Sequence, residues 1–305
     1  MNNLQALLAA ARAHDYAFTT VTPETHRRVL ARREGEAARD LRDVFGWSMP
    51  FRRELLGAGL WDPLQAFNMV EPAGEGLWHS RLRISSAAGT LFLHSAFPTD
   101  AEDSVFFGPD SYRFIAFIEA ELPALGQRRH LVDIGSGSGV GAIAAARLLP
   151  GARLTLTDIN PFALGLAGAN AKHAGLEAEV VEAEGLSGVA DGFDLVIANP
   201  PFVMDEGKRA YRDGGDLCGL RLSLEWAEEA MGRLPAGGAM LLYTGSAIVA
   251  GRDGFRDALD ESAERLSCTL RYAELDPDIF GELLDEPAYR SVERIAAVGA
   301  VLVKA

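Results

Sequence analysis

The feature that most constrains the fold is a regular alternation of short apolar strands and helices that begins at Arg129. Strands are expected at residues 130–134, 153–157, 179–181, 193–198 and 239–244, and helices between them at residues 141–149, 163–173 and 220–234. Strands joined by helices form a parallel sheet with both faces covered. Two further strands, at residues 269–275 and 295–303, have no long helix between them, which predicts an antiparallel last strand. The fold class predicted is therefore α/β, with a Rossmann-like, seven-stranded sheet.

The residues before this sheet predict two smaller units. Residues 1–75 are expected to form a helical domain, because the first apolar residues follow helical spacing: Leu4, Leu7, Leu8 and Ala11. Residues 76–105 are expected to form a β-hairpin linker, because the period changes to that of strands around the turn residues Ala88-Gly89. Residues 106–305 then make up the main domain.

The composition fits a globular protein with an acidic body. The chain has 305 residues, of which 48% are apolar, and its net charge is −14. Residues 1–60 hold nine arginines against seven acidic residues, whereas the remainder carries 20 basic and 36 acidic residues. An acidic body is a poor non-specific partner for phosphate backbones, which argues mildly against bulk nucleic acid as the substrate. The arginines indicate either a solvated basic face or a contact surface for an acidic partner, so nucleic acid stays possible.

The location expected from the sequence is the cytoplasm. There is no apolar run of transmembrane length, and the first residues lack the pattern of a signal peptide. The two cysteines, Cys218 and Cys268, fit a reducing compartment and no metal cluster. The sequence does not indicate an oligomeric state.

A glycine-rich loop follows the first strand of the sheet, in the order Asp133-Ile-Gly135-Ser136-Gly137-Ser-Gly139. Glycines at this place let the backbone turn tightly and approach a ligand, and ligands bind at the carboxyl ends of such strands. The stretch from Gly137 to Ala142 also satisfies the dinucleotide-binding pattern, so the loop alone permits a nicotinamide oxidoreductase or a purely structural turn.

Acidic residues at the strand ends narrow the choice of ligand. Asp133 precedes the glycines, where a carboxylate repels a pyrophosphate but suits a cation such as the amino group of S-adenosylmethionine. Asp158 ends the next strand, where a carboxylate accepts hydrogen bonds from both ribose hydroxyls. Ile159 is expected to cover one face of the adenine, with Asn160 beginning the next helix. Beyond the third strand, Glu184 and Gly185 are expected beside the adenine edge, although an exposed loop acid explains Glu184 equally well.

The fourth strand ends in Asn199-Pro200-Pro201-Phe202. Together with the glycine loop and the strand-ending Asp158, this motif resembles the class I S-adenosylmethionine-dependent methyltransferases. The nearest subgroup is the "small domain" N-methyltransferases, which include the release-factor glutamine N5-methyltransferases. The resemblance covers roughly residues 106–305. It extends loosely to a glycine pair at Gly214-Gly215, after which the usual Asp-Gly-Leu is replaced by Cys218-Gly-Leu.

The resemblance implies a catalytic role for all four residues of the motif. The lone pair of a planar nitrogen is delocalised, so two acceptors that hold its two N–H groups favour attack on a methyl group. The side-chain oxygen of Asn199 and the carbonyl of Pro200 are the expected acceptors. Pro200 and Pro201 make the turn rigid, and Phe202 is expected to stack on a planar acceptor. The positively charged sulfur of the cofactor needs no metal or covalent intermediate.

Two further segments are expected near the site. Phe107 and Ser111 precede the glycine-loop domain and, by the resemblance, line the methionine end of the cofactor pocket, although ordinary packing explains Phe107 equally well. Residues 276–282, between the last two strands, are interpreted either as a substrate lid or as a plain surface loop.

The function predicted is methyl transfer (EC 2.1.1.-) to a planar amide or exocyclic amine nitrogen, with a protein glutamine as the favoured acceptor. Three alternatives stay open. The first is methylation of RNA or DNA at adenine N6 or guanine N2, the second is methylation of a small molecule, and the third is a non-catalytic protein that binds the cofactor. The acceptor is expected to be recognised by residues 1–75.

Overall fold

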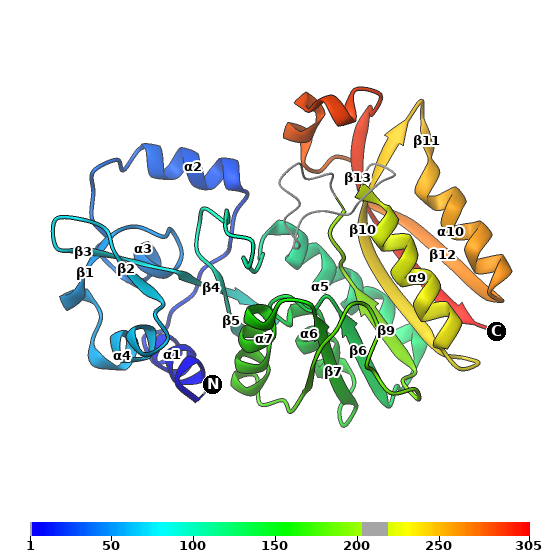
Figure 1. The fold of residues 1–305 in the computed structure, drawn as a ribbon, viewed down its shortest axis with the longest axis horizontal. Coiled ribbons are helices and arrows are strands. Elements are labelled where there is room, and N and C mark those ends of the chain that lie inside the picture. Colours follow the sequence, from blue (N-terminus) through cyan, green and yellow to red (C-terminus); the bar gives the residue numbers. More distant parts are fainter. Residues whose placement is uncertain (1, 203–218) are drawn as a thin grey trace.

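The computed structural model describes residues 2–202 and 219–305, and Figure 1 shows a large α/β unit with a smaller unit beside it. The glycine pair Gly214-Gly215 and Cys218, singled out in the sequence, lie outside the described residues. Within the part described, no helix is long and apolar enough to cross a membrane.

The central sheet has the predicted seven strands. They are β6 (His130–Ile134), β7 (Arg153–Asp158), β8 (Glu179–Glu182), β9 (Leu195–Ala198), β10 (Ala239–Val249), β12 (Cys268–Asp276) and β13 (Arg294–Lys304). Their order is β12-β13-β10-β9-β6-β7-β8, with the short β11 (Arg252–Asp253) paired to β10. Strands β6 to β10 pair in parallel along this path, whereas β13 runs antiparallel to both β10 and β12. The predicted sheet and its antiparallel last strand are confirmed.

Helices cover both faces of this sheet. The helices are α5 (Pro109–Glu121), α6 (Val140–Leu148), α7 (Pro161–His173), α9 (Arg221–Arg233) and α10 (Gly254–Arg265). Apolar residues of α5 and α6 pack on one face, together with the 3-10 turns η2 (Leu122–Leu125), η3 (Gly281–Asp285) and η4 (Pro287–Tyr289). The other face is covered by α9 and α10 (Figure 1). Burial on both faces explains why the central strands are continuous apolar runs in the sequence.

The strand register brings the site residues to one edge of the sheet. Ile134, at the end of β6, pairs with Thr157 of β7 on one side and with Ala198 of β9 on the other. The residues that follow each strand therefore emerge side by side: the glycine loop after β6, Ile159 after β7 and Asn199 after β9. Three segments that are far apart in the sequence thus meet at the carboxyl edge, where ligands of such sheets bind.

The N-terminal unit is only partly helical. Its helices are α1 (Asn2–Ala13), α2 (Pro23–Ala31), α3 (Leu41–Phe45) and α4 (Ala58–Ala66), with the 3-10 turn η1 (Arg53–Leu55). It also contains a small antiparallel sheet of order β1-β3-β2, made by β1 (Phe51–Arg52), β2 (Val70–Pro72) and β3 (Leu77–Ser80). The expectation of a helical domain over residues 1–75 missed β1 and β2, because strands of two or three residues are too short to show a period of two, whereas β3 lies in the stretch where strands were expected.

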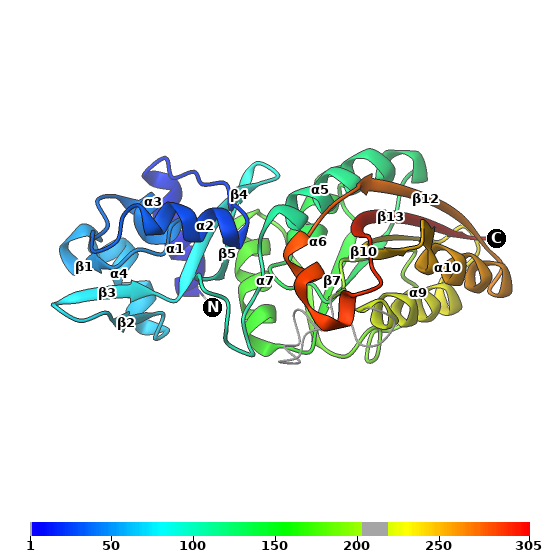
Figure 2. The ribbon, with the colours of Figure 1, turned by 90° about the horizontal axis from the view of Figure 1, so that it is seen from above.

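The predicted hairpin consists of β4 (Leu82–Ala87) and β5 (Thr90–Ser95). Its two turn residues have positive φ, 43° at Ala88 and 67° at Gly89, as a two-residue hairpin turn requires. The apolar residues of the hairpin pack in one cluster with those of α1 and α7. Figure 2 shows the N-terminal unit and the hairpin lying beside α7, at one end of the sheet. The proposed boundaries at residues 75 and 105 stay predictions.

Candidate cofactor and active site

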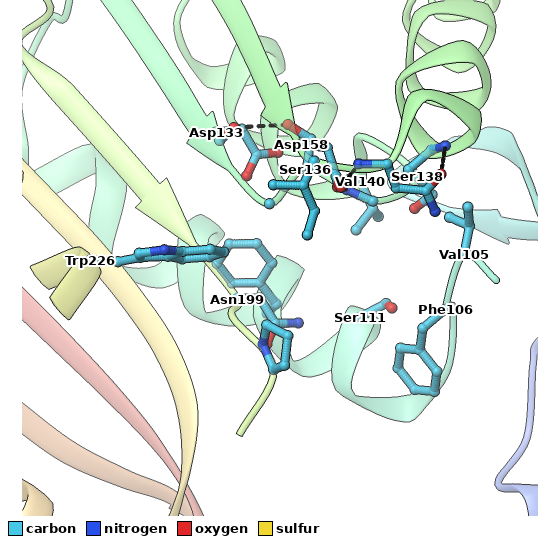
Figure 3. Close-up of a pocket in the computed structure, with 18 of the residues that line it drawn as sticks. Val105, Phe106, Ser111, Asp133, Ser136, Ser138, Val140, Asp158, Asn199 and Trp226 are labelled. Atoms are coloured by element: carbon cyan, nitrogen blue, oxygen red, sulfur yellow. Dashed lines mark hydrogen bonds between the residues drawn. The ribbon is translucent and has the colours of Figure 1, made fainter. Parts of the chain in front are cut away.

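A cavity of about 290 Å³ opens at the carboxyl edge of the sheet. The glycine loop, the residues that follow β7, β8 and β9, the segment before α5 and two residues of α9 line it. Figure 3 shows Asp133, Asp158 and Ser136 along one side of this cavity and Asn199 on the opposite side. The predicted cofactor end and the predicted reacting end therefore face the same space.

The glycine loop has the backbone conformation that its glycines permit. Gly135, Gly137 and Gly139 have φ values of 61°, 53° and 76°, which side chains rarely adopt. A Cβ atom at Gly135 would also lie 2.5 Å from the indole of Trp226. Ser136 lines the cavity while its hydroxyl donates to the carbonyl oxygens of Asp133 and Thr157, which fastens the loop to β6 and β7.

Asp133 lies in the cavity wall at only 2% exposure. Its Oδ2 atom accepts a hydrogen bond of 3.0 Å from the backbone N–H of Ala142. Burial raises the pKa of this carboxyl to about 7; the Ala142 hydrogen bond lowers it in part, and the charge of Asp158 raises it. A cationic partner beside this carboxyl would favour its ionised form and so lower its pKa again.

Asp158 is held rigidly at the end of β7. Its Oδ2 accepts from the N–H of Gly137 at 2.9 Å, and its Oδ1 accepts from the N–H of Asn160 at 2.9 Å. Each carboxylate oxygen keeps further acceptor capacity, so both can take a ligand hydroxyl. Burial raises the pKa of Asp158, and the backbone hydrogen bonds oppose that rise.

Three of the remaining expected cofactor residues line the cavity near Asp158. Ile159 is 54% exposed although it is apolar, so its side chain is free to cover a ligand. Glu184 and Gly185 lie in the loop after β8. Asn160 also lines the cavity, but its side chain caps α7 by accepting from the N–H groups of Phe162 and Ala163.

The motif after β9 divides between the cavity and the core. Asn199 and Pro201 line the cavity, whereas Pro200 is buried and is not part of the lining. Phe202 lies against Gly245 of β10 and contacts Phe280, with ring centroids 5.6 Å apart. Gly245 has no side chain, which leaves room for the ring at this place. Phe202 does not line the cavity, and its stacking on an acceptor stays a prediction.

The segment before α5 also differs from expectation. Phe107, expected at the cofactor, is 3% exposed and stacks on His94, with centroids 4.9 Å apart, behind the cavity wall. Its neighbour Phe106 lines the cavity instead. Ser111 lines the cavity as expected, and its hydroxyl accepts from the N–H of Gly108 at 3.2 Å. Because Phe106 and Phe107 are adjacent and identical in type, the sequence does not indicate which of them faces the cavity.

The loop of residues 276–282 approaches the motif through Phe280. Asp276, at the end of β12, is held by Arg113 of α5 at 2.8 Å. Arg113 also pairs with Asp110, whose other partner is the hydroxyl of Tyr243 on β10. This chain of contacts anchors the loop to α5, although residues 277, 278, 281 and 282 are exposed, so a substrate lid and a plain surface loop both stay open.

Comparison with known families agrees with this geometry. Residues 115–215 match the model of the methyltransferase small domain. This matched stretch, about a third of the chain, is similar to that family. This match and the related sequences that follow are consistent with the predicted class I methyltransferase, and its activity and its cofactor S-adenosylmethionine stay predictions.

The related sequences cover only part of this chain. A release factor glutamine methyltransferase from Deinococcus radiodurans is 32% identical over 126 residues, which are 38% of this chain and 45% of the relative. A ribosomal RNA small subunit methyltransferase C from Pseudomonas paraeruginosa is 38% identical over 73 residues, 24% of this chain and 22% of the relative. A solved methyltransferase from Pyrococcus furiosus overlaps 66% of this chain and 88% of its own, with a TM-score of 0.45 at 18% identity. The chain thus spans less than half the length of these sequence relatives.

Proposed function

We propose that this chain is an S-adenosylmethionine-dependent N-methyltransferase whose acceptor is a planar amide or exocyclic amine nitrogen. The observation that carries the proposal is that Asn199 and Pro201 line the same cavity as the glycine loop and Asp158. A dinucleotide oxidoreductase would place a pyrophosphate at this loop, where the buried Asp133 carboxyl opposes it.

The residues of the cavity fit the cofactor in three respects. Asp158 presents two fixed carboxylate oxygens to the ribose hydroxyls. Asp133 offers a buried carboxyl to the positively charged amino group. Ile159 presents an exposed apolar side chain for the adenine, with Glu184 close to the same end of the cavity. When bound, the cofactor supplies a methyl group on a positively charged sulfur.

The chain's own contribution to the reaction is to orient the acceptor nitrogen. The side-chain oxygen of Asn199 and the carbonyl oxygen of Pro200 accept its two N–H groups, which aims the lone pair at the methyl carbon. With the cofactor bound, a nitrogen placed in this way would take the methyl group and release a proton to solvent, and the sulfur would keep the electron pair of its bond to that methyl group. By comparison with fixed donors in other active sites, losing the Asn199 contact costs ~3 kcal/mol, or about 100-fold in rate.

A protein glutamine is the acceptor that the observations favour. A base held for methylation stacks between aromatic or apolar side chains, whereas the ring of Phe202 is packed on Gly245 and Phe280. The net charge of −14 also disfavours a polyanionic partner. A glutamine side chain has a smaller planar group, which Phe106 and Pro201 suffice to flank.

A ribosomal RNA base is the second candidate acceptor. It is supported by the relative named as a ribosomal RNA methyltransferase and by exposed arginines on α2. Arg27 and Arg28 are both largely exposed, although each pairs with Glu24. Because these ion pairs offset part of the positive charge, the surface is a weaker argument than the position of Phe202.

A labelling experiment separates the two acceptors. The purified protein is incubated with cell extract and cofactor carrying a labelled methyl group, and aliquots are digested with protease or with ribonuclease. We expect the label to be lost on proteolysis and to survive ribonuclease. The matched control is Asn199→Ala, which should bind S-adenosylhomocysteine as the wild type does but transfer the label about 100-fold more slowly. Equal labelling by Asn199→Ala would overturn the proposed role of the motif.

A further inference from the structure

A second hollow, of about 250 Å³, lies directly beside the cofactor cavity. The two spaces share four lining residues: Glu184, Gly185, Leu222 and Trp226. They are therefore neighbouring compartments, and the side chains that both spaces touch form the wall between them.

Trp226 and Leu222 supply the bulk of this wall. They are four residues apart on α9, so they lie on the same face of that helix, one turn from each other. The indole of Trp226 is only 9% exposed and lies against Gly135 of the glycine loop. Figure 3 shows the ring reaching in from α9 towards the space between Asp133 and Asn199.

The wall stands at the end of the cavity where the adenine is proposed to bind. Glu184 and Gly185, which line both spaces, come from the loop after β8. Trp226 is also fixed in place, because its indole is in contact with the glycine loop on one side and packs with the apolar core between α9 and the sheet on the other. The indole therefore stands between the two spaces.

We propose that Trp226, supported by Leu222, sets the size limit for the adenine end of the cofactor. This inference rests on the proposed function, because it takes S-adenosylmethionine as the ligand of the larger cavity. A group added to the exocyclic amine of the adenine meets the indole, and a smaller residue at position 226 lets that group enter the second hollow.

The second hollow also defines which added groups it accepts. Glu225 and Glu229 line it beyond the wall. Glu225 pairs with Arg221 at 2.7 Å, and Glu229 accepts from the N–H of Leu186 at 3.0 Å. Carboxylates in these positions disfavour an anionic substituent but tolerate a neutral one. A benzyl group is therefore a suitable probe.

The test is calorimetric titration with S-adenosylhomocysteine and with its analogue benzylated on the exocyclic amine of the adenine. Wild type should bind the analogue on the order of 10- to 100-fold more weakly than S-adenosylhomocysteine, as expected when a packed site is overfilled. Trp226→Ala should bind the two ligands within about threefold of each other, which is less than the effect of one overpacked group. Trp226→Phe, which keeps a ring in the wall, is the matched control and should discriminate as the wild type does.

The outcomes separate this inference from the proposed function. If wild type binds neither ligand, the proposed function fails. If wild type binds both equally, or if Trp226→Ala still rejects the analogue, the wall is not the size limit. If circular dichroism shows that Trp226→Ala is unfolded, the same titrations are made with Leu222→Ala, because Leu222 is only half-buried. If that variant discriminates between the two ligands as the wild type does, the inference is overturned.

Discussion

Replacing Asp133 by Asn should stabilise the protein at neutral pH while abolishing its affinity for the cofactor. The pKa of the buried carboxyl is about 7 in the folded chain, against an ordinary value of 3.8. Folding therefore opposes ionisation of Asp133. The folded state loses stability as the pH rises from about 4 to 7, and the whole loss is present above pH 7.

The size of this loss follows from the pKa difference. A shift of about three units, at 1.36 kcal/mol each, corresponds to a destabilisation on the order of 4 kcal/mol above pH 7. Asn has nearly the same shape and its side-chain oxygen accepts the Ala142 N–H in the same way, but it does not ionise. The variant should consequently keep the stability that the wild type loses.

Urea unfolding of wild type and Asp133→Asn at pH 4, 6 and 8 measures the effect. The difference in the free energy of unfolding should grow in favour of the variant by several kcal/mol between pH 4 and pH 8. Comparing the two proteins at each pH cancels the titration of the histidines, which both contain. Asp260→Asn, on the exposed side of α10, is the control and should leave the pH dependence unchanged. Parallel stability curves for Asp133→Asn and wild type would refute the argument.

Two further predictions concern the same cavity, and a third concerns the packing of Phe202. Binding of S-adenosylhomocysteine, measured by calorimetry, should weaken below pH 7, because protonated Asp133 no longer attracts the amino group; a flat profile would contradict the pairing. Asp158→Ala should weaken that binding by on the order of 100-fold, as expected when two charge-assisted hydrogen bonds are lost, and unchanged affinity would place the ribose elsewhere. Gly245→Ala should lower the free energy of unfolding by about 1–3 kcal/mol, because its Cβ overlaps the Phe202 ring; Phe202→Leu in the same chain should restore part of it, and purely additive effects would argue against the contact.

The sheet and the cofactor end of the site could be predicted because their signals are local. An alternation of strands and helices fixes the connectivity, and parallel strands place their carboxyl ends at one edge. Asp158 and Asn199 were therefore expected together, since each follows a strand, although they are 41 positions apart in the sequence.

The remaining features depend on contacts that no local pattern encodes. The direction of the Phe202 ring is decided by the missing side chain of Gly245, on the next strand of the sheet. Trp226 has the helical spacing of an ordinary core residue, so nothing distinguished it as part of the cavity wall. Phe106 and Phe107 are residues of the same type, and only the packing of Phe107 on His94 determines that Phe106 is the one that faces the cavity.

The contacts of Asn170 on α7 limit where the chain can be cut to give a smaller folded fragment. Its buried amide donates to the carbonyl oxygens of Leu93 in the hairpin and Ser138 in the glycine loop, and it accepts the N–H of Leu93. One side chain therefore holds both the hairpin and the loop that shapes the cofactor cavity. A fragment starting at residue 106 would lose both hydrogen bonds between Asn170 and Leu93 and would expose to water the apolar face of α7 that packs on the hairpin. The glycine loop thus owes part of its support to residues that precede the sheet, and we expect a minimal active fragment to begin upstream of β4.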